Sequence, residues 1–197
     1  MKIIKLKNIN KLFFSYENIA SIFKISEASA MVTASRYVEA GLILRQKRNL
    51  YILKEKWDML DHNNLFSHAN ILQVPSDISL MTALSYYEIT TQIQQNYIES
   101  FATKRTKEFS IENTVFTYSK IKSQLYNGFI REQNIFSALP EKAFLDALYL
   151  NIIGRYNFDL TSVDLSKFDR KFMNILAKSY PDKIQNMVRK DEYTGTA

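Results

Sequence analysis

Basic residues near the start of this sequence have the types and spacing to bind a polyanion. Arg45, Lys47 and Arg48 lie close together, with Arg36 and Lys11 upstream of them. Guanidinium and ammonium groups pair with phosphate oxygens, and an arginine can also form two hydrogen bonds to the edge of a guanine. This chemistry predicts binding to double-stranded DNA.

The net charge of the chain lies in the same segment. The 197 residues include 26 Lys or Arg and 20 Asp or Glu, which gives a formal charge of +6. Residues 1–58 hold 11 basic and 5 acidic residues, a difference of six, and the rest of the chain holds 15 of each. The whole imbalance therefore belongs to one small segment, as is typical of a DNA-binding module.

Acidic residues offer a second kind of chemistry, which the sequence supports poorly. Glu141, Lys142 and Asp146 could form an acid–base set, but Glu141 and Asp146 do not share a helical face. Asp77 lacks the Glu-any-Lys pair on a following strand that a restriction-type nuclease would need. No nucleophile elbow, metalloprotease motif or phosphate loop is present. We therefore predict no catalytic residue and expect that the chain is not an enzyme.

The sequence also predicts no metal ion and no cofactor. His62 and His68 lack the further ligands that a metal ion needs, and both are expected at the surface. There is no Cys, which excludes disulfides and Cys-ligated zinc. This composition is compatible with a reducing compartment, and we expect a cytoplasmic location.

The basic and apolar N-terminus is not predicted to be a signal peptide. Lysines at positions 5, 7 and 11 interrupt its apolar run, and no small-residue cleavage site follows. Residues 8–14 are instead predicted to form a short helix. Nowhere does the sequence hold about 18 consecutive apolar residues, so we expect no membrane partner.

Two helices joined by a tight turn are predicted to position the basic residues. Ser15 can cap a helix over residues 15–23, and Ser26 can cap a second helix over residues 27–40. Ala30 lies on the inward face of the second helix, where a small side chain allows two helices to cross closely.

The second helix and the segment after it predict a winged helix-turn-helix. Strands over residues 42–45 and 50–53 form a basic hairpin, the wing, which suits phosphate contacts together with the lysines at positions 5, 7 and 11. Arg36 is the only basic residue on the outward face of the helix. Winged helices also serve in protein interactions, and so few charges on the recognition helix keep that alternative open. The predicted DNA-binding residues are Lys11, Ser26, Ser29, Val32, Thr33, Arg36, Arg45, Lys47 and Arg48.

The predicted fold is α+β, with the winged helix followed by a mixed α/β domain whose sheet is mainly antiparallel. The winged helix should span residues 1–58, a polar connection residues 59–70 and the C-terminal domain residues 71–197. In that domain we expect a turn at residues 75–77, helices over 78–89 and 139–153, short strands within 93–121, one strand over 129–136, and amphipathic helices after residue 167. Leu84, Leu145 and Leu148 should lie in its core.

Several segments, taken in order, resemble one known family. Residues 41–43 read Gly-Leu-Ile before the basic wing, residues 79–87 have the form SLxxALSYY, and residues 140–150 have the form PEKAxLDxLYL. In this order and spacing they resemble the AbiEi-type antitoxins, the transcriptional-regulator half of bacterial abortive-infection toxin–antitoxin pairs of type IV. The likeness spans nearly the whole chain. This sequence has Arg48-Asn49-Leu50 where a Gly is usual in the wing.

The resemblance implies a repressor that binds inverted repeats in its own promoter and regulates its own operon. It also implies that the C-terminal domain counters a toxin that resembles a nucleotidyltransferase, without the need for a tight complex. A stand-alone winged-helix regulator without a toxin is one alternative, and a nuclease-like enzyme is another. A neighbouring nucleotidyltransferase-like gene would separate the first alternative from the antitoxin.

Overall fold

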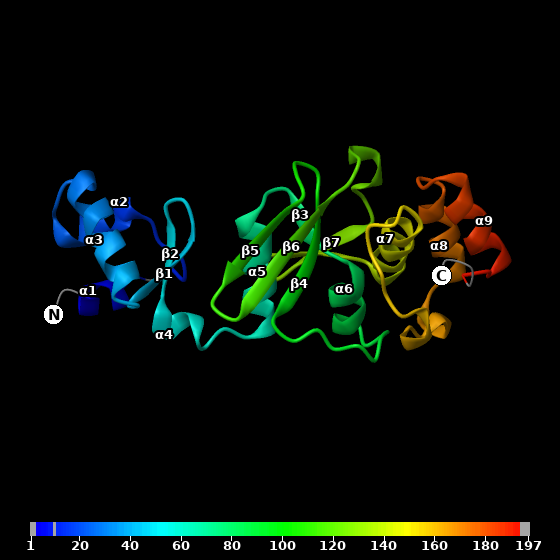
Figure 1. The fold of residues 1–197 in the computed structure, drawn as a ribbon, viewed down its shortest axis with the longest axis horizontal. Helices are drawn as coiled ribbons and strands as arrows, with labels where there is room; N and C mark the ends of the chain where they lie inside the picture. The colour runs from blue at the N-terminus through cyan, green and yellow to red at the C-terminus, as the bar shows by residue number, and fades with distance from the viewer. Residues whose placement is uncertain (1–2, 10, 194–197) are drawn as a thin grey trace. The chain divides into compact units, whose positions relative to one another are not determined.

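The computed structural model of the chain describes residues 3–9 and 11–193 and has an α+β fold (Figure 1). Contacts within the chain divide it into two units, residues 1–65 and residues 66–197. The division falls inside helix α5 (His62–Leu72), so most of the predicted polar connection is helical. Within the described residues, no helix is both long and apolar enough to cross a membrane.

Three helices open the first unit. They are α1 (Ile3–Lys7), α2 (Tyr16–Phe23) and α3 (Glu27–Glu39). Ser26 caps α3 as predicted, because its hydroxyl oxygen accepts a hydrogen bond from the amide of Ser29 at 3.2 Å. The prediction of a helix over residues 8–14 is wrong, since the helix lies earlier and ends at Lys7.

A hairpin and a short helix complete this unit. The hairpin pairs β1 (Ile43–Lys47) with β2 (Leu50–Leu53), and α4 (Lys54–Trp57) follows. Phe14 joins the hairpin because its backbone exchanges two hydrogen bonds with that of Tyr51, at 2.9 and 2.8 Å. The segment between α1 and α2 is thereby fixed to β2.

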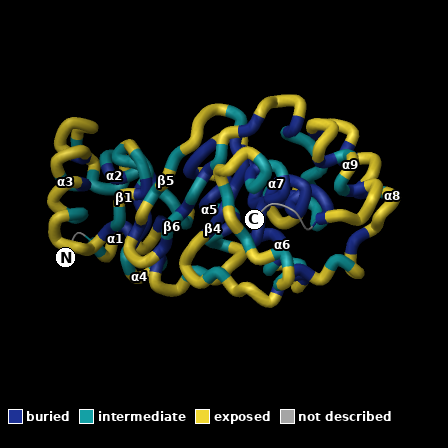
Figure 2. The backbone as a smooth tube through the Cα atoms, turned by 45° about the vertical axis from the view of Figure 1, so that its right-hand side comes forward, coloured by how far each residue is buried: buried dark blue, intermediate teal, exposed yellow. Residues whose placement is uncertain are grey.

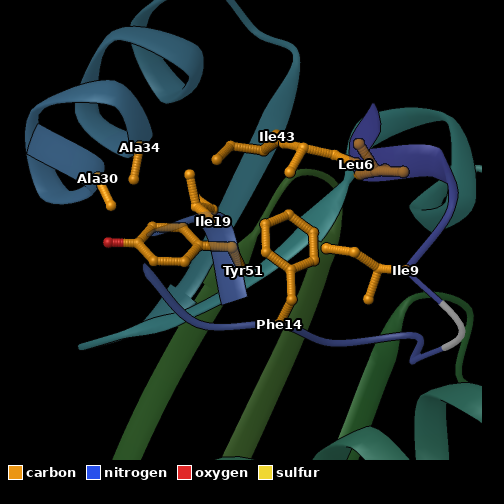
Figure 3. Packing of buried hydrophobic residues seen from close by; sticks show 9 residues of the cluster. Leu6, Ile9, Phe14, Ile19, Ala30, Ala34, Ile43 and Tyr51 are labelled. Atoms are coloured by element: carbon orange, nitrogen blue, oxygen red, sulfur yellow. The ribbon is translucent and has the colours of Figure 1, made fainter. Parts of the chain in front are cut away.

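The core of the first unit is small and depends on two alanines of α3. Ala30 and Ala34 are fully buried and point toward Ile19 of α2 and Tyr51 of β2 (Figure 3). A larger side chain at either position would push α3 away from its neighbours, so the close packing here requires small residues. The rings of Phe14 and Tyr51 pack beside them with centroids 6.2 Å apart.

A six-stranded mixed sheet forms the centre of the second unit, and its strand order is β5-β6-β4-β3-β8-β7. Strands β3 and β8 are parallel, as are β4 and β6, whereas the other three pairs are antiparallel. The strands are β3 (Ser76–Ile78), β4 (Tyr97–Ala102), β5 (Lys107–Ile111), β6 (Thr114–Lys120), β7 (Phe129–Glu132) and β8 (Ile135–Ala138).

Helices cover the two faces of this sheet. Tyr118 of β6 donates a hydrogen bond to the carbonyl of Ala69, which places α5 on one face. Asp77 and Phe101 are paired across β3 and β4 and therefore point to the other face, where the Lys142 ammonium lies over the Phe101 ring. The remaining helices are α6 (Leu80–Tyr86), α7 (Pro140–Ile152), α8 (Arg170–Ala177) and α9 (Asp182–Lys190), with 3₁₀ turns at Ser123–Leu125, Leu160–Ser162 and Leu165–Lys167.

The structure corrects three local predictions in this unit. The predicted turn at residues 75–77 contains most of strand β3, which is central in the sheet. The predicted single strand over residues 129–136 is the hairpin β7–β8, whose turn residues Gln133 and Asn134 have positive φ angles. His68 is fully buried rather than at the surface, with its ring packed edge-on against Phe116.

The three leucines predicted to be core are buried, and Leu145 on α7 is 0% exposed. We expect Leu145→Ala to lower the free energy of unfolding by about 2–5 kcal/mol, because it leaves a cavity in a closed core. Urea denaturation measures the loss. Ile175→Ala on α8 is the control, since Ile175 is 59% exposed. A cost for Leu145→Ala no greater than that of the control would contradict this assignment of the core.

Candidate nucleic-acid interface

The outward face of α3 is exposed along its length (Figure 2). Ser29, Val32 and Arg36 follow one another on this face at helical spacing, and all three are exposed. Val32 lies opposite the buried alanine side of the helix, and 51% of its surface is accessible. The helix therefore presents a hydroxyl, an apolar group and a guanidinium group in sequence along its outer side.

Hydrogen bonds join three of the predicted site residues at the start of α3. The Ser26 hydroxyl donates to the Ser29 hydroxyl at 2.9 Å. The Thr33 hydroxyl, which is half-buried, donates to the Ser29 carbonyl at 2.8 Å. The hydroxyl protons of Ser26 and Thr33 are thus both engaged within this unit, so Ser29 is the best suited of the three to donate to a ligand.

The cations of the hairpin differ in exposure. Arg45 on β1 and Arg48 in the turn are exposed, whereas Lys47 is half-buried. Lys11 is exposed in the segment that precedes Phe14. These positions suit contacts with a backbone of phosphates, because such contacts require charge at the surface and no defined partner geometry.

Asn49 holds the turn of the hairpin in place, a role that the sequence analysis missed. Its side-chain oxygen accepts a hydrogen bond from the amide of Tyr16 at 2.8 Å, and its side-chain nitrogen donates to both carboxylate oxygens of Glu17 at 2.9 Å. Hydrogen bonds from Ser15 and Asn49 lower the pKa of Glu17 to about 2. Asn49 has a φ angle of 57°, a conformation that Gly and Asn adopt most readily. The asparagine at position 49 was therefore a signal in the sequence for a turn with a positive φ angle.

Several lysines of the first unit are already paired. The Lys7 ammonium contacts the Glu55 carboxylate at 2.6 Å, and Lys54 pairs with Asp58 one helical turn away. Lys56 donates to the carbonyl of Ile9 at 3.2 Å. Lys7 was expected to contact phosphates, but its charge is partly balanced within the unit.

The predicted site residues thus form two groups. The first group follows one face of α3, and the second lies on the hairpin, whose turn is attached to the start of α2 through Asn49. The hydrogen bonds and ion pairs of the described residues join neither Arg45 nor Arg48 to α3.

The acidic residues considered in the sequence analysis lie in the interior of the second unit. Lys142 and Asp146 form an ion pair along α7 and are 1% and 0% exposed. Asp146 also accepts hydrogen bonds from the hydroxyls of Tyr180 at 2.5 Å and Ser79 at 2.7 Å. Glu141 accepts a hydrogen bond from the backbone amide of Asp169 at 2.9 Å.

Asp77 completes this buried group, which the sequence could not reveal because its members are far apart in the chain. Its Oδ2 atom has no hydrogen-bond partner among the described residues. Burial raises the pKa of Asp77 well above its usual range, although the charge of Lys142 opposes the shift. These residue types are the ones found in acid–base catalytic sites. Here, however, Asp77, Lys142 and Asp146 are each at most 1% exposed and are closed to a substrate.

Within residues 3–9 and 11–193, no three His, Cys, Asp or Glu side chains are grouped so that they could hold a metal ion. Comparison of the chain with models of protein families and with curated proteins gives no match.

A further buried carboxyl, that of Glu99 on β4, makes the second unit sensitive to pH. Burial raises its pKa to about 7, and the Tyr156 hydroxyl, which donates to it at 3.1 Å, limits the shift. In the unfolded chain its pKa returns to about 4.5. The folded state therefore binds the extra proton between these pH values, and stability falls as the pH rises from 4.5 to 7.

Glu99→Gln should remove this part of the pH dependence, because the amide keeps the shape and cannot ionise. As the pH rises from 4.5 to 8, the natural chain should lose about 3 kcal/mol more of its free energy of unfolding than the variant does. Urea denaturation at several pH values measures it, with the exposed Glu108→Gln as control. Parallel pH profiles for Glu99→Gln and the natural chain would contradict the assignment.

Proposed function

We propose that the first unit is a winged helix-turn-helix that binds double-stranded DNA, and that the chain is an AbiEi-type antitoxin acting as a repressor of its own operon. The observation that carries the proposal is the exposed face of α3 beside a basic hairpin, in the segment that contains the whole net charge of the chain. A helix of this width fits the major groove, and a hairpin beside it meets the phosphates.

Binding to DNA accounts for this surface better than binding to a protein. A protein interface is depleted of charge at its centre, whereas the hairpin here carries Arg45, Lys47 and Arg48. Lys7 and Lys54 have acidic partners, so the proposed phosphate contacts are assigned to Arg45, Arg48 and Lys11.

The order of groups on α3 suggests which bases it reads. Arg36 is suited to the two acceptors of a guanine in the major groove. Val32 and Ala28 are exposed and apolar, and such side chains contact the methyl group of thymine. A half-site that contains both guanine and thymine is the proposed target, and two half-sites in inverted repeat would require a symmetric pair of chains.

The toxin-related part of the proposal rests on the resemblance of residues 79–87 and 140–150 to the antitoxin family. Both segments lie in the second unit, where they form α6 and α7 and line the buried group around Asp146. A regulator without a toxin has the same build, so the neighbouring gene decides between these two functions.

Salt dependence tests the proposed DNA contact directly. With about four to six phosphates neutralised, a plot of log affinity against log salt concentration should have a slope of roughly −4 to −5, because counterions are released on binding. Fluorescence anisotropy of a labelled duplex measures it with the full chain. An affinity that does not change with salt would overturn the proposal.

Two arginine substitutions should have different effects. Arg36→Ala should cost about 1–3 kcal/mol on a site selected from a random duplex pool and reduce the preference for that site. Arg48→Ala should weaken all duplexes alike and make the salt slope less steep by about one.

Arg189→Ala on α9 is the charge-matched control, since Arg189 is exposed and lies in the second unit. If Arg36→Ala leaves the discrimination between selected and scrambled duplexes intact, α3 is not the reading helix.

A further inference from the structure

A cavity of about 390 Å³ opens in the second unit where the end of β6 meets the end of α7. Its size falls within the range of about 300–1,000 Å³ that is usual for small-molecule sites. No acidic side chain of the described residues lines it. The lining residues are Lys120, Ile121, Lys122, Tyr149, Ile153 and Arg155.

Among the described residues, no acid forms an ion pair with the three cations of this cavity. Residues 59–197 hold equal numbers of basic and acidic residues, so three cations at one cavity are a local excess. Within residues 3–9 and 11–193, neither Lys120, Lys122 nor Arg155 forms an ion pair. A concave site of one charge concentrates ligands of the opposite charge.

The backbone holds the cationic residues in place on two sides. On the strand side, the amide of Ile121 donates to the carbonyl of Ala102 at 3.0 Å, and the amide of Lys120 donates to the Thr106 hydroxyl at 3.1 Å. On the helix side, the amide of Arg155 donates to the carbonyl of Leu150 at 2.8 Å. This last bond belongs to a turn that ends α7 and requires the positive φ angle of Gly154.

The remaining wall of the cavity is apolar and supported from the interior. Tyr149 packs its ring against that of Tyr180, with centroids 6.0 Å apart and an angle of 66°. Tyr180 is in turn fixed by its hydrogen bond to Asp146. Ile121 is buried, while Ile153 is 41% exposed at the cavity. A ligand for this site therefore needs an apolar or flat part as well as negative charge.

The C-terminal end of α7 opposes the binding of an anion, but the three cations of the cavity outweigh this effect. A helix end carries the equivalent of about half a negative charge. Arg155, which lies just beyond this end, already balances it, and two lysines remain. The net local charge is still clearly positive.

We propose that this cavity binds a nucleoside phosphate. The phosphates would lie on Lys120, Lys122 and Arg155, and the base would pack on Tyr149 and Ile153. Each cation supplies a charge-assisted hydrogen bond to a phosphate oxygen, and Arg155 can supply two at once. The proposal does not depend on DNA binding by the first unit, because all six lining residues belong to the second.

Calorimetric titration of the full chain with ADP, GDP, CDP and UDP tests the site, with adenosine and inorganic phosphate as separate arms. We expect at least one nucleotide to bind saturably below about 1 mM and at least tenfold more tightly than either adenosine or phosphate. Lys122→Gln and Arg155→Gln should each weaken that binding about tenfold without changing the melting temperature, because both side chains are exposed. Lys183→Gln on α9 is the matched control and should leave it unchanged.

Four results would overturn the proposal. One is the absence of saturable binding by all four nucleotides. Another is phosphate binding as tight as nucleotide binding, which would mean that the apolar wall recognises nothing. The third is an effect of Lys183→Gln equal to that of Arg155→Gln, which would indicate unspecific attraction. Binding of a single-stranded RNA through Lys122 and Arg155, with no nucleotide bound, would likewise replace a small-molecule site with a nucleic-acid surface.

Discussion

The carboxylate of Asp146 is the group on which the arrangement of the second unit depends. It is wholly buried, pairs with Lys142 and accepts hydrogen bonds from Ser79 at 2.7 Å and Tyr180 at 2.5 Å. A buried carboxylate without such partners would cost several kcal/mol, so all three donors must be in place whenever the unit is folded. Ser79 precedes α6 and Tyr180 follows α8, so one side chain fixes three separate segments. Apolar residues could fill the same space with similar stability, and we therefore interpret the ion pair as a device that specifies the arrangement.

Asp77 adds a second carboxyl to the same interior, close enough to Lys142 and Asp146 for their charges to act on its pKa. One ammonium group cannot balance two carboxylates in a medium that screens poorly, and burial accordingly raises the pKa of both Asp77 and Asp146. Burial therefore favours the protonated form of Asp77. Folding raises the proton affinity of the carboxyls of both Asp77 and Glu99. Both carboxyls are buried and closed to a substrate.

The elements that the sequence predicted well are those whose limits are set by nearby residues. The helices α2 and α3 begin after the serines Ser15 and Ser26, and α7 begins at Pro140, and all three show apolar spacing that can be read from nearby residues. The elements it missed are decided by distant partners. His68 is buried because Phe116 packs against it, and β3 is a strand because β4 and β8 flank it on both sides. The same limit applies to the candidate sites, since the exposed face of α3 follows from periodicity alone. The role of Asn49 and the meeting of Asp77 with Lys142 require the folded chain.

The net charge along the sequence identifies the basic segment, but net charge is a poor guide to where a ligand can bind. In the first unit, Lys7 and Lys54 contribute to the net charge and are held by acids of their own unit. In the second unit the count is balanced, yet among the described residues the cavity at the end of β6 is lined by cations and by no acid. Screening explains the difference, because charges more than about 8–10 Å apart in physiological salt hardly act on one another. A ligand responds to the charges within that distance, so the partner of each side chain matters more than the sum over the domain.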